Sequence, residues 1–154
     1  MRCPVMDNPP LKLAEFLPDR LLVLAEAVAQ PLARLCSEQY GLTIAEWRIL
    51  AVLNESGQLT SAAISHAASM HKVKVSRAIA GLEGKGLIER TANREDMRET
   101  FVALTDKGLE IYREVASQAQ EFSLKLTARL SKSDMNALWR IIDVLNESAG
   151  GDIG

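Results

Sequence analysis

Cysteine and aromatic residues are scarce in this chain of 154 residues. Its two cysteines, Cys3 and Cys36, form no CxxC pair, and with His66 and His71 they make no metal-ligand pattern. We therefore expect no metal or other cofactor, and a reduced protein located in the cytoplasm. Only 5% of the residues are aromatic, and the apolar residues are mostly Leu, Ala, Ile and Val. This composition favours helices that pack on other helices.

Long apolar runs are absent as well. No run approaches the roughly 20 residues that a helix needs to span a bilayer, and the N-terminus lacks the basic and apolar regions of a signal peptide. We expect no membrane partner. The sequence also shows no nucleophile paired with a base, no pair of carboxylates and no glycine-rich phosphate loop. An enzyme is therefore not expected.

Positive charge is limited overall but concentrated locally. The formal net charge is -2 at pH 7, which argues weakly against nucleic acid, because binding to phosphates needs a positive field. However, the segment from Met70 to Leu82 contains Lys72, Lys74 and Arg77 and no acidic residue. This segment can present a positive field to DNA on an otherwise acidic protein.

Hydrophobic periodicity and helix-capping residues predict an almost entirely helical chain. Two capping boxes are visible, Thr43 to Glu46 and Ser131 to Asp134, each a hydroxyl cap followed three residues later by a carboxylate. The predicted helices span about 18–40, 43–56, 60–69, 71–85 and, as two helices, 105–147. Two strand-like runs, 87–91 and 100–104, flank the charged segment 93–99 and predict a hairpin.

The order of these elements predicts the fold class: mainly α with a small β-hairpin wing, in which a winged helix-turn-helix is flanked by dimerisation helices. The outer helices carry apolar stripes too long for one small lobe to cover, so we assign dimerisation to them. The predicted parts are a flexible N-terminal arm (1–15), one domain (16–147) containing the dimerisation helices (about 18–40 and 105–147) and the winged helix-turn-helix (about 43–104), and a loose tail (148–154).

The predicted helix over 71–85 is the candidate recognition helix. The second helix of a helix-turn-helix lies in the major groove of DNA and contacts bases through residues near its N-terminus. Here these residues are His71, Lys72, Val73, Lys74, Ser76 and Arg77. Lysine and arginine can bind phosphates or guanine, serine can bind either, and valine can contact a thymine methyl. The alternative is an ordinary amphipathic helix whose basic residues are merely solvated.

The polar tip of the hairpin is the second candidate DNA contact. Arg94 and Arg98 project from it, with Asp96 between them. Directly after a basic recognition helix, such a tip has the features of a wing whose arginine enters a narrow minor groove. We expect Asp96 to hold a neighbouring arginine by a charge-assisted hydrogen bond. A solvated turn is the alternative.

Four consecutive motifs carry a family resemblance: GLTIAEWRILAVL, VKVSRAIAGLEGKGLIER, the Asp-x-Arg of Asp96 and Arg98, and FVALTDKG. In order and spacing they resemble the core of the MarR (multiple antibiotic resistance regulator) family. The preceding segment FLPDRLLVLAEAVAQPLARL resembles the first helix of such proteins, so the resemblance covers about 16–147. It implies a winged-helix dimer with interlocking terminal helices. Ser76 and Arg77 match the Ser-Arg of the recognition helix, and Arg98 matches the wing-tip arginine.

The chain departs from the family pattern at two places. His71 stands where an aspartate often caps the recognition helix, and Met97 replaces a frequent basic residue at the wing. Family members that sense oxidants carry a cysteine near the start of the first helix, and neither Cys3 nor Cys36 lies there. We expect Cys36 to fill a small buried apolar position.

The resemblance also implies a ligand site, because many family members bind small aromatic or phenolic acids between the DNA-binding lobe and the dimer helices. Trp47, Arg48 and Arg20 offer a stacking surface and partners for a carboxylate. In the alternative interpretation Trp47 is a core residue and Arg48 belongs to an internal ion pair, and we favour this alternative.

The sequence therefore predicts a transcriptional regulator that binds double-stranded DNA sequence-specifically. We expect a homodimeric repressor on an inverted-repeat operator, released by a small phenolic or aromatic acid. The competing interpretation is a winged-helix module that contacts protein and does not bind DNA specifically. The basic, acid-free start of the recognition helix argues against that alternative.

Overall fold

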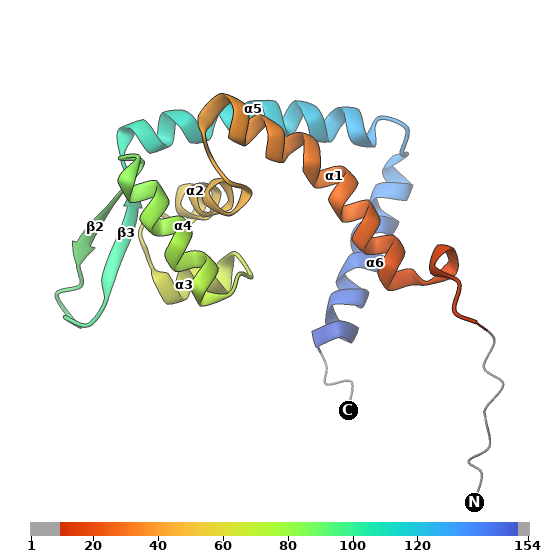
Figure 1. The fold of residues 1–154 in the computed structure, drawn as a ribbon, viewed down its shortest axis with the longest axis horizontal. Coiled ribbons are helices and arrows are strands. Elements are labelled where there is room, and N and C mark those ends of the chain that lie inside the picture. Colours follow the sequence, from red (N-terminus) through yellow and green to blue (C-terminus); the bar gives the residue numbers. More distant parts are fainter. Residues whose placement is uncertain (1–9, 151–154) are drawn as a thin grey trace, which may run out of the picture. The chain divides into compact units, whose positions relative to one another are not determined.

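The computed structural model describes residues 10–150, which form two units, one ending at Val115 and the other beginning at Ala116. The elements are η1 (Leu13–Glu15), α1 (Leu17–Tyr40), α2 (Ile44–Ser56), β1 (Leu59–Thr60), α3 (Ser61–Ala67), α4 (Lys72–Gly84), β2 (Ile88–Ala92), β3 (Thr100–Leu104), α5 (Asp106–Thr127) and α6 (Lys132–Gly150) (Figure 1). Helix α5 begins in the first unit and continues into the second. The mainly helical winged fold predicted from the sequence is confirmed.

Helices α2 and α3 begin at the capping residues that the sequence predicts. The hydroxyl of Thr43 accepts a hydrogen bond from the backbone nitrogen of Glu46 at 3.1 Å, and the Glu46 carboxylate accepts one from the backbone nitrogen of Thr43 at 2.8 Å. The hydroxyl of Thr60 caps α3 by accepting from the backbone nitrogen of Ala63 at 3.2 Å. These caps satisfy backbone donors that the first helical turn leaves unpaired.

The second unit contains the rest of α5 and all of α6. The predicted capping box begins α6: the hydroxyl and the backbone nitrogen of Ser131 donate to the Asp134 carboxylate at 2.7 and 2.8 Å. These bonds, the hydroxyl bond first, lower the pKa of Asp134. In the last turns of α6, the Ser148 hydroxyl donates to the carbonyl of Val144 at 2.8 Å.

Two boundaries differ from the prediction. Helix α6 continues to Gly150, so the prediction of a loose tail is wrong for 148–150. The physical reason is that Ser148 uses its hydroxyl within the helix and leaves the backbone ladder intact. At the other end, the predicted flexible arm over 1–15 contains η1. Residues 1–9 of that arm and 151–154 of the tail lie outside the described residues.

A small antiparallel sheet completes the first unit. Its strand order is β1-β3-β2, and the hairpin register pairs Ile88 with Leu104 and Arg90 with Val102. Strand β1 was not predicted from the sequence, because a strand of only two residues leaves no periodic signal. It pairs Leu59 with Val102 and joins the start of α3 to the hairpin.

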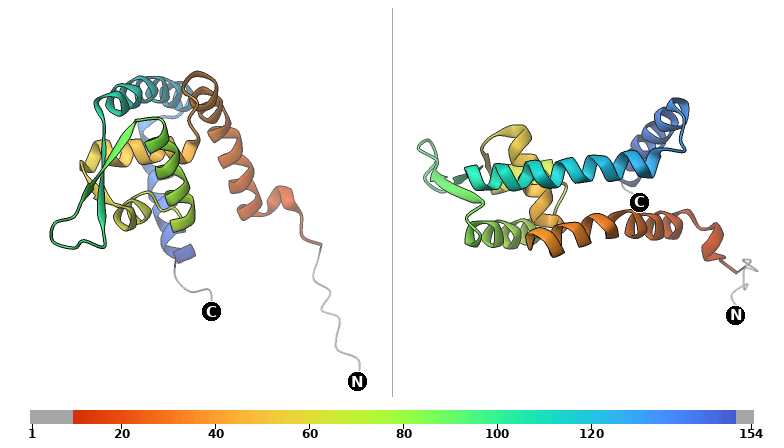
Figure 2. Two further views of the ribbon diagram at one scale, coloured as in Figure 1. Left: turned by 60° about the vertical axis from the view of Figure 1, so that its left-hand side comes forward. Right: turned by 90° about the horizontal axis from the view of Figure 1, so that it is seen from above.

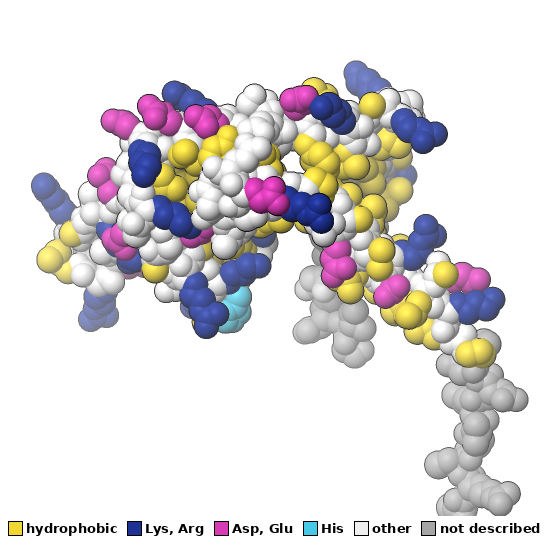
Figure 3. Space-filling view, turned by 45° about the horizontal axis from the view of Figure 1, so that its top comes forward, with side chains coloured by type: hydrophobic (Ala, Val, Ile, Leu, Met, Phe, Trp, Pro, Cys, Tyr) yellow, Lys and Arg dark blue, Asp and Glu magenta, His cyan; other side chains and the backbone are white. Residues whose placement is uncertain are grey.

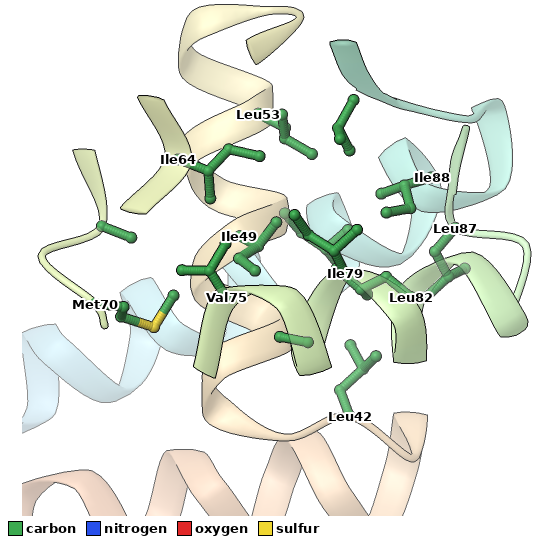
Figure 4. Close-up of a cluster of buried hydrophobic side chains, with 14 of the residues drawn as sticks. Leu42, Ile49, Leu53, Ile64, Met70, Val75, Ile79, Leu82, Leu87 and Ile88 are labelled. Atoms are coloured by element: carbon green, nitrogen blue, oxygen red, sulfur yellow. The ribbon is translucent and has the colours of Figure 1, made fainter. Parts of the chain in front are cut away.

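The core of the first unit lies between α2, α3, α4 and the hairpin. Leucine, isoleucine and valine dominate it, and Figure 4 shows their side chains converging from these elements. Fully buried members include Ile49 and Leu53 of α2, Ile64 of α3, and Ile79 and Leu82 of α4. The helix-turn-helix is therefore one packed body, and α4 cannot rotate without exposing apolar surface.

A buried carboxylate connects α2 to α4. Glu46 is 4% exposed, and the ammonium of Lys85 donates to both its oxygens at 2.7 Å. Helix α4 passes so close that a Cβ atom on Gly81 would lie 2.2 Å from Oε1 of Glu46. A side chain at residue 81 would therefore displace the Glu46 carboxylate from its present position.

A second close approach joins α5 to the base of the hairpin. Gly108 is buried, and a Cβ atom there would lie 1.9 Å from the carbonyl oxygen of Leu87. The backbone nitrogen of Thr105 donates to the same carbonyl at 3.1 Å, and the Thr105 hydroxyl donates to the carbonyl of Gly86 at 2.8 Å. The first turn of α5 therefore rests directly on the chain that enters β2.

The Gly81 contact predicts a specific loss of stability. Gly81→Ala should lower the free energy of unfolding by about 1–3 kcal/mol, because the new methyl group forces Glu46 away from Lys85 and Thr43. Gly84→Ala is the matched control, since nothing lies within 4 Å of its Cβ position. That change should be neutral or slightly stabilising, because alanine favours helix more than glycine does. Urea unfolding at one protein concentration measures both, and equal stabilities would contradict the contact.

Candidate nucleic-acid interface

Helix α4 separates its apolar residues from its basic residues. Its buried residues are Val75, Ala78, Ile79 and Leu82. The opposite side is exposed, and Val73 on it is 53% exposed. Each residue turns the helix by about 100°, so Lys72 and Lys74 diverge by about 200°, with Arg77 between them. The helix thus presents a central ridge with one lysine on each flank.

One flank of α4 faces the wing, the hairpin with its connecting loop over 88–104. A cleft on this side, the wing-side cleft, is lined by Thr60, Ser61, Ala62, Lys72, Ser76, Arg98, Glu99 and Thr100. Figure 2 shows α4 and the hairpin side by side. The structure therefore brings together Lys72 and Ser76 of the predicted recognition helix and Arg98 of the predicted wing.

The other flank of α4 faces the start of α2. Here the α2-side cleft is lined by Thr43, Ala45, Glu46, His71, Val73, Lys74, Arg77 and Ala78. His71 and Lys74 therefore lie on this flank, and Val73 and Arg77 of the central ridge border the same cleft. The single carboxylate in this list, Glu46, is already bound to Lys85 and to the backbone of Thr43. Within residues 10–150, neither Lys74 nor Arg77 forms an ion pair, so both side chains can present positive charge on this side.

His71 occupies the N-cap of α4. Its Nδ1 accepts a hydrogen bond from the backbone nitrogen of Val73 at 3.4 Å. Imidazole thus takes the capping role that Ser, Thr, Asp and Asn usually fill. Histidine in place of the usual aspartate therefore preserves the cap of α4, but the capping group is an imidazole and not a carboxylate.

The turn between α3 and α4 is held by two side chains. Ser69 has φ of 49°, in the left-handed region. The Ser65 hydroxyl donates to the carbonyl of Met70, and the guanidinium of Arg48 donates to the carbonyl of Ala68. Arg48, a candidate ligand residue, thus has a positioning role: it connects α2 to the turn that precedes the recognition helix.

The wing loop is organised by short polar side chains. The side-chain oxygen of Asn93 accepts from the backbone nitrogens of Glu95 (3.0 Å) and Asp96 (3.3 Å). The Asp96 carboxylate accepts from the backbone nitrogen of Arg98 at 3.0 Å. The expected charge-assisted hydrogen bond between Asp96 and a neighbouring arginine is therefore present, with the backbone amide of Arg98 as the donor, and this short side chain shapes the turn. Arg94 and Arg98 are both exposed.

The other two candidate ligand residues, Trp47 and Arg20, do not share a site with Arg48. Trp47 stacks on Tyr112 of α5, with ring centroids 5.4 Å apart and planes at 14°. Arg20 lines a groove along α1 with Leu13, Val23 and Leu24. Within residues 10–150, no hydrogen bond, ion pair or ring contact joins Arg20 to Trp47 or Arg48.

Cys36 is fully buried in the core, and this burial raises the pKa of its thiol. In the described part of the chain, no group of His, Cys, Asp and Glu side chains could hold a metal ion. The helices of residues 10–150 include none that is both long enough and apolar enough to cross a membrane.

Sequence reasoning missed part of this surface. It did not single out Thr60, Ser61 and Thr100, whose side chains line the wing-side cleft beside Arg98. The Thr60-Ser61 pair at a helix start was a usable signal, because hydroxyls there can also bind phosphate. Figure 3 shows basic side chains gathered beside a histidine at one edge of the first unit. A basic helix beside a basic hairpin is the arrangement of a winged-helix DNA-binding protein.

Comparison with known proteins agrees with this class. The sequence profile of the MarR family matches residues 40–99. YwoH, an uncharacterised HTH-type transcriptional regulator of Bacillus subtilis, is 30% identical over 100 residues, which cover 65% of this chain and 72% of YwoH. The homoprotocatechuate degradative operon repressor of Escherichia coli is 23% identical over 122 residues, or 79% of this chain and 82% of the repressor.

A solved structure extends the likeness over nearly the whole chain. The MarR family regulator Sco3205 of Streptomyces coelicolor, solved in complex with DNA, superposes with a TM-score of 0.82 at 25% identity, covering 95% of this chain and 94% of Sco3205. The protein is a DNA-binding winged-helix transcriptional regulator. More particularly, the chain belongs to the MarR family.

The position of Arg77 between the two lysines predicts different roles for the basic residues of α4. Arg77→Ala should cost on the order of 1–3 kcal/mol on the preferred duplex and relax sequence preference, because we expect Arg77 to face the floor of the groove. Lys72→Ala or Lys74→Ala should weaken binding to all duplexes and reduce the slope of log affinity against log salt by about one per phosphate contacted. Fluorescence anisotropy at several salt concentrations measures these quantities. The reverse assignment would mean that α4 is rotated in the groove.

Proposed function

We propose that this protein is a homodimeric repressor that binds an inverted-repeat operator through α4 and the wing. The observation that carries this proposal is the placement of Lys72, Ser76 and Arg98 at one cleft beside the exposed ridge of α4. One recognition helix and one wing read a single half-site, and a two-fold dimer reads two half-sites as an inverted repeat. The E. coli relative, which is named a repressor, supports repression as the outcome.

The dimer is supported by exposed apolar side chains on the terminal helices. Leu17, Leu21, Leu22, Val23 and Leu24 of α1 are between 43 and 58% exposed. In the second unit, the exposed apolar residues include Leu124, Leu126, Leu138, Trp139, Ile141 and Val144. Figure 3 shows hydrophobic side chains exposed along α1. Exposed apolar surface of this extent marks an interface, and a second copy of the chain is the partner we propose.

The test combines assembly with DNA binding. Analytical ultracentrifugation should show a dimer at micromolar concentration and two chains on each duplex selected from a randomised pool. Affinity should fall steeply with salt. Arg98→Ala should weaken binding most where A·T-rich flanks narrow the minor groove, whereas Arg94→Ala, the matched control at the same loop, should have a smaller effect.

Three results would contradict this proposal: a folded monomer at micromolar concentration, no duplex selected, or binding insensitive to salt. The last two would favour a winged-helix module that contacts protein. Equal effects of Arg98→Ala and Arg94→Ala would reject the wing assignment alone.

For the effector, we propose a small phenolic or aromatic acid whose carboxylate engages Arg48. The E. coli relative represses an operon for degradation of homoprotocatechuate, which supports an acid of this kind. A carboxylate binds a guanidinium more strongly than the neutral carbonyl of Ala68 does. Bound acid would therefore draw Arg48 away from the turn before α4 and loosen the recognition helix.

Arg48→Gln tests this coupling, because glutamine carries no charge and cannot form an ion pair with a carboxylate. Homoprotocatechuate and a panel of phenolic and benzoic acids serve as probes. At least one should raise the dissociation constant of the parent for its duplex and have little effect on the variant. No change in the parent with any acid of the panel would overturn the effector proposal and leave DNA binding unaffected.

A further inference from the structure

The cap of α4 fixes the chemistry of the free side of His71. Its Nδ1 accepts the backbone hydrogen of Val73 at 3.4 Å. A nitrogen that accepts a hydrogen bond carries no proton, so in the neutral imidazole the proton lies on Nε2. The capping bond thus selects one tautomer and makes Nε2 a hydrogen-bond donor. An aspartate cap has no such donor.

The surroundings of His71 leave this donor available. The residue is exposed and lines the α2-side cleft with Lys74 and Arg77. Glu46, the carboxylate of this cleft, is bound by Lys85 and by the backbone nitrogen of Thr43. Within residues 10–150 no acceptor takes a hydrogen bond from Nε2 of His71. The imidazole therefore offers an unused donor at a positively charged edge.

We propose that Nε2 of His71 donates a hydrogen bond to a phosphate oxygen of the operator, as a neutral contact that sets the register of α4 on the duplex. This inference rests on the proposed function. Phosphate is favoured over a base for two reasons. His71 lines the α2-side cleft together with Lys74 and Arg77, two cations that attract phosphate, and the cap holds the ring at the start of the helix, where the helix dipole attracts anions.

A neutral donor predicts a distinctive salt response. A lysine that binds phosphate displaces counterions, so its removal lowers the slope of log affinity against log salt. A neutral imidazole displaces none, so its removal lowers affinity and leaves the slope unchanged. His71 and Lys74 lie on the same flank of α4 and are therefore matched probes of the two kinds of contact.

Three substitutions separate the donor from the cap. Asparagine at residue 71 can cap through its oxygen and donate through its amide, whereas aspartate can only cap. Alanine can do neither. The duplex is the one that the parent protein selects from a randomised pool. Binding is measured at about pH 8, where free histidine is neutral. Thermal unfolding checks that the capping variants fold like the parent. Lys74→Ala provides the slope expected for loss of a charged contact.

We expect His71→Asn to bind like the parent and His71→Ala to bind on the order of tenfold more weakly per half-site, with the parent slope and unchanged sequence preference. His71→Asp should fold like the parent and bind at least as poorly as His71→Ala. Nitrogen NMR of the parent should show Nδ1 without a proton.

Other outcomes overturn the inference and leave the proposed function standing. They are His71→Asp binding like the parent, a slope reduced as in Lys74→Ala, an altered sequence preference in His71→Ala, or a proton on Nδ1. A parent chain that selects no duplex would overturn the proposed function and this inference together.

Discussion

The DNA-binding surface depends on one buried carboxylate. Glu46 closes the capping box that begins α2, binds the ammonium of Lys85 beyond the end of α4, and lies against the backbone of α4 at Gly81. A buried charge is tolerable only when it is paired and hydrogen-bonded, and here both oxygens have partners. The same residue therefore determines where α2 begins and how closely α4 approaches it. The α2-side cleft, which is lined by the start of α2 and by α4, follows from this spacing.

Local chemistry accounts for what the sequence could predict. The capping boxes at Thr43 and Ser131 are recognisable in the sequence as a hydroxyl residue followed three residues later by a carboxylate, and both are formed in the structure. The spacing of Val75, Ile79 and Leu82 likewise indicated the buried face of α4. Signals of this kind depend on neighbours within one or two turns, which are the contacts that a sequence displays directly.

The contacts that could not be predicted are of two kinds. Some join residues far apart in the sequence, and others involve a side chain with several possible hydrogen-bond partners. Lys85 lies 39 residues from Glu46, and no periodicity connects them. Asp96 had two arginines within reach, yet it binds a backbone amide, because that donor has a fixed position and costs no side-chain entropy. Arg48 presents the same problem: a basic residue on α2 is equally compatible with a ligand, an ion pair or the carbonyl of Ala68.

The contact between Gly108 and Leu87 has a mechanical consequence. With a glycine at the crossing, the backbones of α5 and of the chain entering β2 touch without an intervening side chain, and Thr105 adds two hydrogen bonds across the joint. No compressible layer separates the two segments, and a hydrogen-bonded helix is stiff over its first turns. A tilt of the start of α5 and a tilt of the hairpin are therefore the same motion. Any displacement of the first turn of α5 is thus transmitted to the wing.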